Sequence, residues 1–148
     1  MKTNKPLILR PVAWIFTCFA ILALPFAAEL VCKLGAFFVS CLDNLSTVIV
    51  IFLVMMFGSI YLSLFTYSAM ILPSLFVNLS DAIYPTHHAF RFYFVGSYLI
   101  LYCLAIVAAG ILGFVSGGPM FWFYVRHGWL AFSSIMLMVY GREKANKT

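Results

Sequence analysis

Three ionisable residues lie inside long apolar stretches and are the first candidates for chemistry. Glu29 follows an apolar run near the start of the chain, and Arg126 and His127 interrupt another near its end. An unpaired charge within hydrocarbon costs about 2.5–3.5 kcal/mol on insertion scales. We therefore predict a Glu29–Arg126 ion pair that faces other helices or a wet cavity, where it could form part of a permeation or substrate site. The alternative is that both side chains reach outward to the membrane surface.

His127 has the side-chain chemistry of a proton relay or an axial haem ligand. The only other histidines are His87 and His88, in a loop expected at the opposite side, so haem would need a second subunit. A hydrogen-bonded histidine between helices is the favoured interpretation. His87 and His88 are adjacent and would point about 100° apart on a helix, so they could not share a metal ion. We predict no cofactor and no metal site.

The loop that carries His87 and His88 also has charged neighbours. Asp81 precedes the two histidines and Arg91 follows them, which predicts a small polar cluster on the cytoplasmic side. A solvated loop is the favoured interpretation. The alternative is a docking or gating site for a cytoplasmic partner.

Three hydroxyl side chains share one face of a predicted helix. They are Ser59, Ser63 and Thr66, at spacings of four and three residues. In a membrane such hydroxyls bond their own backbone or a neighbouring helix, worth on average about 0.6 kcal/mol each. Alternatively, they line a hydrated path in an oligomer. Helix packing is favoured over a pore, and the absence of fixed charge leaves ion selectivity unpredicted.

A ribbon of small residues marks another predicted helix. Its members are Ala105, Ala109, Gly113 and Gly117, at four-residue spacing, with Gly110 beside them. Small residues at this spacing let two helix axes approach closely in lipid. The ribbon therefore predicts helix docking, by a helix of the same chain or of another copy.

Motifs of catalysis and of nucleic-acid binding are not evident in the sequence. It contains no H-E-x-x-H, G-x-S-x-G or P-loop and no paired carboxylates within an apolar stretch, so we expect no enzyme. The net charge is +5, but the basic residues gather near the ends and the span boundaries, as in proteins that contact anionic lipid. The cysteines form no C-x-x-C; whether Cys32 and Cys41, which flank one connection, form a disulfide is left open.

The elements that hold these residues must be apolar helices. The chain is 65% hydrophobic and 9% charged, with a mean hydropathy of +1.08, whereas a soluble domain carries roughly 25% charged residues. The excess apolar surface must face lipid. The apolar residues form unbroken runs without the alternation of barrel strands, which predicts an all-α, polytopic single domain.

Four spans with short loops account for most of the 148 residues. We predict them at about 12–34, 45–72, 92–115 and 120–140, since each span needs roughly 20 residues. Pro73 is expected to end the second span, with an interfacial segment over about 74–83. The start of the chain imitates a signal peptide, but its apolar run is longer than the usual ~7–15 residues and Phe26 spoils the cleavage site. We expect it to be retained.

Lysine and arginine predict the orientation. With an even number of spans, both termini share the side that holds most of the basic residues, which is the cytoplasm. We expect an integral protein of the plasma or inner membrane that associates with itself or with another membrane subunit. Its predicted function is a homo-oligomeric channel, pore or small transporter. The alternative is a non-catalytic membrane subunit, such as an anchor, an assembly factor or an immunity-type interaction protein.

Overall fold

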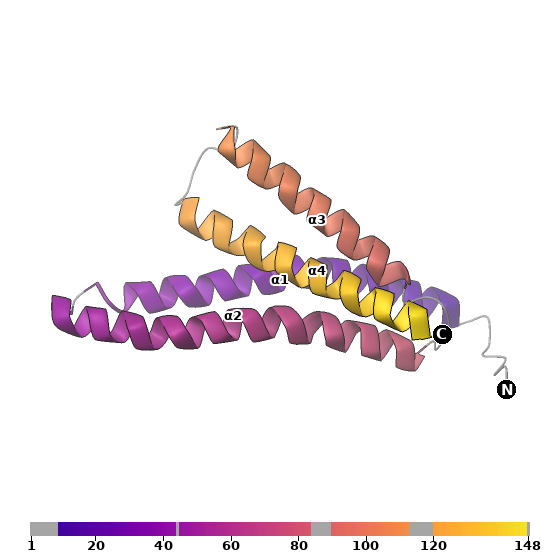
Figure 1. Ribbon diagram of the computed structural model, residues 1–148, viewed down its shortest axis with the longest axis horizontal. Helices are drawn as coiled ribbons and strands as arrows, with labels where there is room; N and C mark the ends of the chain where they lie inside the picture. The colour runs from indigo at the N-terminus through magenta and orange to yellow at the C-terminus, as the bar shows by residue number, and fades with distance from the viewer. Residues whose placement is uncertain (1–8, 44, 84–89, 113–119, 148) are drawn as a thin grey trace.

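The chain folds into four α-helices that run up and down (Figure 1). A computed structural model describes residues 9–43, 45–83, 90–112 and 120–147. The helices are α1 (Leu9–Ser40), α2 (Thr47–Ile83), α3 (Phe90–Ile111) and α4 (Met120–Lys147). The start of α1 and the end of α4 lie at one end of the bundle, called here the terminal end. The predicted all-α, four-helix fold is confirmed.

Three of the four helices, α1, α2 and α3, are long and apolar enough to cross a membrane. The helix α4 does not meet this criterion, so the fourth predicted span stays a prediction. The physical reason is its composition: Arg126, His127, Ser133 and Ser134 all lie within it and lower its hydropathy.

The helices α1 and α2 are longer than the sequence predicted. The helix α2 continues through Pro73 to Ile83, where we expected a break and a separate segment over 74–83. Proline removes only the hydrogen bond to the carbonyl of Ala69, and breaking further backbone bonds in apolar surroundings would cost more. For the same reason α1 passes through Pro25 and ends at Ser40, beyond the predicted boundary at 34.

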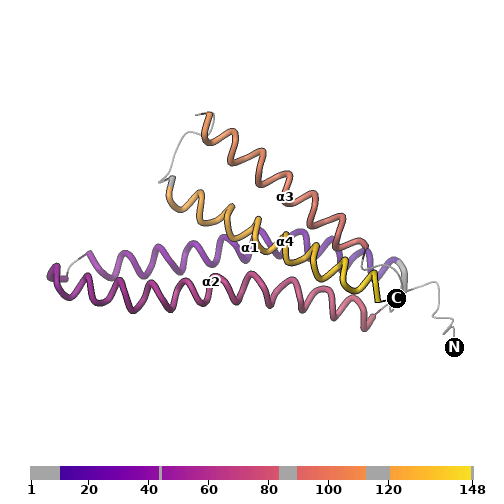
Figure 2. The backbone as a smooth tube through the Cα atoms, viewed as in Figure 1, coloured from indigo at the N-terminus to yellow at the C-terminus, as the bar shows by residue number. Residues whose placement is uncertain are grey.

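The central element of the bundle is α4, which packs against each of the other three helices (Figure 2). Its Trp129 and Leu137 are fully buried, and Phe92 of α3 and Leu24 of α1 contribute to the same core. The indole Nε1–H of Trp129 donates to the Oγ of Ser68 on α2 at 3.0 Å. The least apolar helix thus organises the packing.

A close approach of α3 to α4 occurs at Gly96, a residue that the sequence pattern did not single out. A Cβ on Gly96 would lie 2.7 Å from the backbone oxygen of Ser134 and 2.5 Å from Cγ of Met138. The predicted small-residue ribbon lies mostly elsewhere on α3, with Ala105 exposed and Ala109 only partly buried. Its one tightly packed member is Gly110, against the ring of Phe123. Gly113 and Gly117 lie outside the described residues.

The two longest helices extend past the rest of the bundle. Figure 1 shows the hairpin of α1 and α2 continuing beyond the start of α4, while α3 leans away from α4 toward the same end. We call residues 34–40 of α1 and 47–60 of α2 the distal hairpin. Most of its large apolar side chains are exposed, among them Phe52 and Met55.

Candidate functional site

The structure brings Glu29 of α1 and Arg126 of α4 together. An Nη1–H of Arg126 donates to Oε2 of Glu29 at 3.1 Å, and Nζ of Lys33 lies 4.0 Å from Oε1. The Arg126 and Glu29 side chains are 43% and 42% exposed. We call these three residues the distal charged cluster; its members lie at the side of the bundle and are not enclosed in its core.

His127 is buried and is held by the preceding turn of α4. Its Nδ1 lies 2.8 Å from the carbonyl oxygen of Phe123, and the two rings pack with centroids 4.3 Å apart. A carbonyl oxygen can only accept, so Nδ1 must carry a proton. The other ring nitrogen, Nε2, has no hydrogen-bond partner among residues 9–43, 45–83, 90–112 and 120–147. The imidazole is therefore fixed in orientation but retains a free nitrogen.

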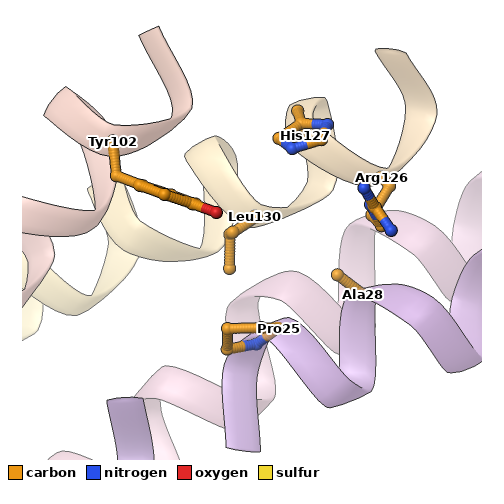
Figure 3. A pocket seen from close by; sticks show the side chains of 6 residues that line it. All are labelled: Pro25, Ala28, Tyr102, Arg126, His127 and Leu130. Carbon is orange, nitrogen blue, oxygen red and sulfur yellow. The ribbon is translucent and has the colours of Figure 1, made fainter. Parts of the chain in front are cut away.

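A cavity of about 190 Å³ lies between α1, α3 and α4, next to the distal charged cluster (Figure 3). Its polar lining comes from Arg126 and His127 of α4 and from Tyr102 of α3. The Tyr102 ring extends from α3 with its hydroxyl beside Leu130. Sequence reasoning missed Tyr102, because it sits in an unbroken apolar run and nothing in that run indicates which side of α3 faces α4.

The hydroxyl stripe of α2 faces away from the chain's own helices. Ser59, Ser63 and Thr66 each donate to the carbonyl four residues earlier, at 2.8–2.9 Å. Two residues beyond members of the stripe, Tyr61 and Ser68 contact α1 and α4 through hydrogen bonds. Two residues turn a helix by about 200°, so the stripe lies nearly opposite the face that packs in the bundle.

Two members of the predicted loop cluster, Asp81 and Arg91, lie in the helices α2 and α3. Arg91 is buried, donates to Oγ of Ser80 at 2.8 Å and lies over the ring of Trp14 at 5.8 Å. Asp81 pairs with Lys144 of α4 at 3.3 Å. This corrects the expectation of a solvated cluster: the charges of Asp81 and Arg91 help join helices, because partners on other helices lie within reach. His87 and His88 lie outside the described residues.

A second polar cavity, of about 200 Å³, lies at the terminal end between α2 and α4. Ser74 and Asn78 of α2 line it together with Tyr140, Glu143 and Lys144 of α4. At the surface, Lys147 donates a hydrogen bond to the carboxylate of Glu143, which lowers the pKa of that carboxyl. Polar residues of α2 and of the end of α4 therefore line the same cavity.

The cysteines offer neither a disulfide nor a metal site in the described part of the chain. All four are free thiols, including Cys32 and Cys41, whose pairing the sequence left open. Cys32 is buried, with its Sγ 3.7 Å from the carbonyl oxygen of Trp122. Within the described ranges, no three His, Cys, Asp or Glu side chains converge as metal ligands would.

Comparison of the chain with protein-family models, with curated proteins and with solved structures gives no match. Three features of the geometry bear on function. These are the distal charged cluster with its cavity, the outward hydroxyl stripe of α2, and the polar contacts at the terminal end.

Proposed function

We propose that this chain is an integral membrane protein whose four helices all cross the bilayer, and that copies of it assemble into a channel or small transporter. The spacing of its charges supports the crossing. From Tyr61, bonded to the Val31 carbonyl beside the distal charged cluster, the rise along α2 to Asp81 is about 30 Å. Along α4 the rise from Arg126 to Lys144 is about 27 Å. A bilayer has a hydrocarbon thickness of about 30 Å, so these two charged levels fit its two surfaces.

The low hydropathy of α4 is compatible with a crossing, because its polar groups face protein. Ser133, Ser134 and His127 are buried among the helices, and Arg126 has its carboxylate partner. Polar side chains within a membrane-spanning helix are tolerated where they face the bundle interior and have partners there. Crossing four times places both termini on one side, and the Lys and Arg distribution favours the cytoplasm.

The outward hydroxyl stripe is the observation that carries the channel proposal. Within one chain it faces no other helix, whereas copies arranged around an axis would turn it toward a shared path. Each oxygen still has lone-pair capacity after donating to the backbone, and can replace part of an ion's water shell.

Flux through liposomes tests this proposal. The full chain is reconstituted and the leak of small ions and of uncharged solutes is measured, together with the oligomeric state in lipid. We expect a closed oligomer, and a flux that Ser63→Leu reduces at least about tenfold by closing the path. Ser40→Leu is the matched control, since Ser40 is an exposed hydroxyl bonded to its own helix but outside the stripe. A monomer without flux, or equal flux in both variants, would refute the proposal.

A second candidate, a non-catalytic membrane subunit, is favoured by the distal hairpin. From Thr47 to Ile60 this hairpin rises about 20 Å beyond the level of the distal charged cluster. Its exposed side chains are almost all apolar, and tilting by the usual ~20° would bring only part of it into hydrocarbon. A second protein would cover such a surface.

Crosslinking in native membranes separates the two candidates. A photoreactive residue at Phe52 is expected to capture another copy if the chain forms a homo-oligomer, and a different membrane protein if it is a subunit. Placing the same group at Leu101, an exposed position on α3, controls for random collisions. Capture of lipid alone at both positions would count against either assembly.

A further inference from the structure

The distal charged cluster contains more positive than negative charge. Lys33 and Arg126 share the single carboxylate of Glu29, at 4.0 and 3.1 Å, which leaves one of the two positive charges without a counter-charge. The chain has only three other acidic residues, Asp43, Asp81 and Glu143. Two of them pair with lysines at the terminal end. The third follows the end of α1, about 15 Å along the helix axis from Lys33.

The cavity beside this cluster has hydrogen-bonding groups without protein partners. Arg126 uses Nη1 for Glu29, which leaves its Nη2 and Nε groups available. Neither the hydroxyl of Tyr102 nor Nε2 of His127 bonds any residue in the part of the chain that the structure describes. His127 is only 4% exposed, yet it lines the cavity. These groups line the cavity and can hydrogen-bond a polar ligand that enters it.

We propose that this cavity binds an oxyanion of the phosphate type, either a free anion or the phosphate of an anionic lipid headgroup. The guanidinium of Arg126 offers two parallel donors that match two oxygens of such a group. Tyr102 donates a third hydrogen bond from α3. Because Nδ1 of His127 carries the proton of the neutral ring, Nε2 accepts a hydrogen bond from a hydroxyl or a water of the bound group. Pro25, Ala28 and Leu130 form the apolar part of the cavity wall (Figure 3).

The size and position of the cavity fit this ligand. A volume of about 190 Å³ corresponds to roughly six water molecules at about 30 Å³ each, enough for a phosphate group and some water. The site lies at the level where the proposed membrane surface meets α1 and α4, so headgroups and dissolved anions both reach it. The proposal does not depend on a path along α2, and binding can be present in a protein that conducts nothing.

Calorimetric titration with inorganic phosphate tests the free-anion source in the detergent-solubilised full chain. Saturable binding is expected, and Arg126→Gln should weaken it at least about tenfold through the loss of a charge-assisted bond. Tyr102→Phe should weaken it about three- to tenfold. The Tyr102 hydroxyl has no bond within the described chain, so this variant is not expected to disturb folding. Arg142→Gln removes an exposed cation at the terminal end and should change nothing.

Native mass spectrometry tests the lipid source. The protein is released from vesicles of equal parts phosphatidylglycerol and phosphatidylcholine, and the retained lipid is identified. Retention of phosphatidylglycerol that is lost in Arg126→Gln and Tyr102→Phe, but kept in Arg142→Gln, identifies a headgroup as the ligand. Phosphate binding without lipid retention identifies a free anion. If the chain binds neither probe, or binds equally well in all three variants, the proposal is overturned.

Discussion

The relation between hydropathy and burial is opposite in the helices α2 and α4. The apolar helix α2 has most of its large side chains exposed, whereas the more polar α4 contains the fully buried Trp129 and Leu137. In a soluble protein the apolar helix would be the core. On the proposed membrane location, the apolar surface of α2 meets lipid and the more polar α4 meets protein. Four experiments test this difference.

Truncating a large side chain on each helix gives the largest contrast. Trp129→Ala should reduce the free energy of unfolding by about 3–5 kcal/mol, because it leaves a void and removes the bond to Ser68. Phe52→Ala on α2 should cost less than about 0.5 kcal/mol, since its side chain is 67% exposed. Denaturation in mixed micelles measures both. Equal losses would contradict the assignment of α4 as the core helix.

Substitution of one glycine on α3 and one on α2 by alanine should change stability in opposite directions, by smaller amounts. Gly96→Ala should destabilise by about 1–3 kcal/mol, because the new Cβ would meet the backbone oxygen of Ser134 at 2.7 Å. Gly58→Ala on α2 meets nothing within 4 Å and should stabilise by up to about 1 kcal/mol through helix propensity. The same micelle assay applies. A stabilising Gly96→Ala would show that α3 does not pack closely on α4.

Substitutions of two serines test whether water is bound at the buried face of α4. The Oγ of Ser133 is buried and has no hydrogen-bond partner among the described residues. Ser133→Ala should therefore stabilise the protein by up to about 1 kcal/mol, by removing an unsatisfied polar group. Ser63→Ala, at an exposed and backbone-bonded hydroxyl, should leave stability within about 0.5 kcal/mol. Destabilisation by Ser133→Ala would instead indicate a water or partner bound there.

The smallest effect is expected at the exposed tail of α4, where water screens charges. The hydrogen bond from Lys147, and then its charge, hold the pKa of Glu143 below its ordinary value of 4.5. A carboxyl with a lowered pKa contributes stability above its unfolded value and loses it as the pH falls through the folded value. A carbon-13 titration of the carboxyl should give a midpoint below 4.5, and Lys147→Gln should raise it. An unchanged midpoint would mean that the pair does not form in solution.

The sequence predicts the helices well, because uncharged runs of this length have no other stable form in hydrocarbon. It fails at prolines: Pro25 and Pro73 break helices in water but are tolerated where backbone groups have no competing partner. The juxtaposition of Glu29 and Arg126 followed from the cost of separate charges, and the structure places them 3.1 Å apart. Predicting this pair requires only the residue types and their depths within the predicted spans.

The packing of α3 against α4 could not be predicted from the sequence. Composition favoured the ribbon around Ala105 and Ala109, whereas a backbone-to-backbone approach to α4 occurs at Gly96. A single glycine gives no repeat to recognise, and its importance depends on the angle at which α3 crosses α4. The same rotation decides that Tyr102 lines the cavity, so its place could not be predicted either.

The polarity of α4 has a consequence for biosynthesis on the proposed topology. A segment with Arg126, His127, Ser133 and Ser134 partitions poorly from the translocon into lipid by itself. This segment is stable in the bilayer only when earlier helices offer surfaces for its polar groups. The helix α4 would therefore enter the bilayer only after the helices that precede it, and a truncation that removes α1 should leave the end of α4 on the wrong side of the membrane.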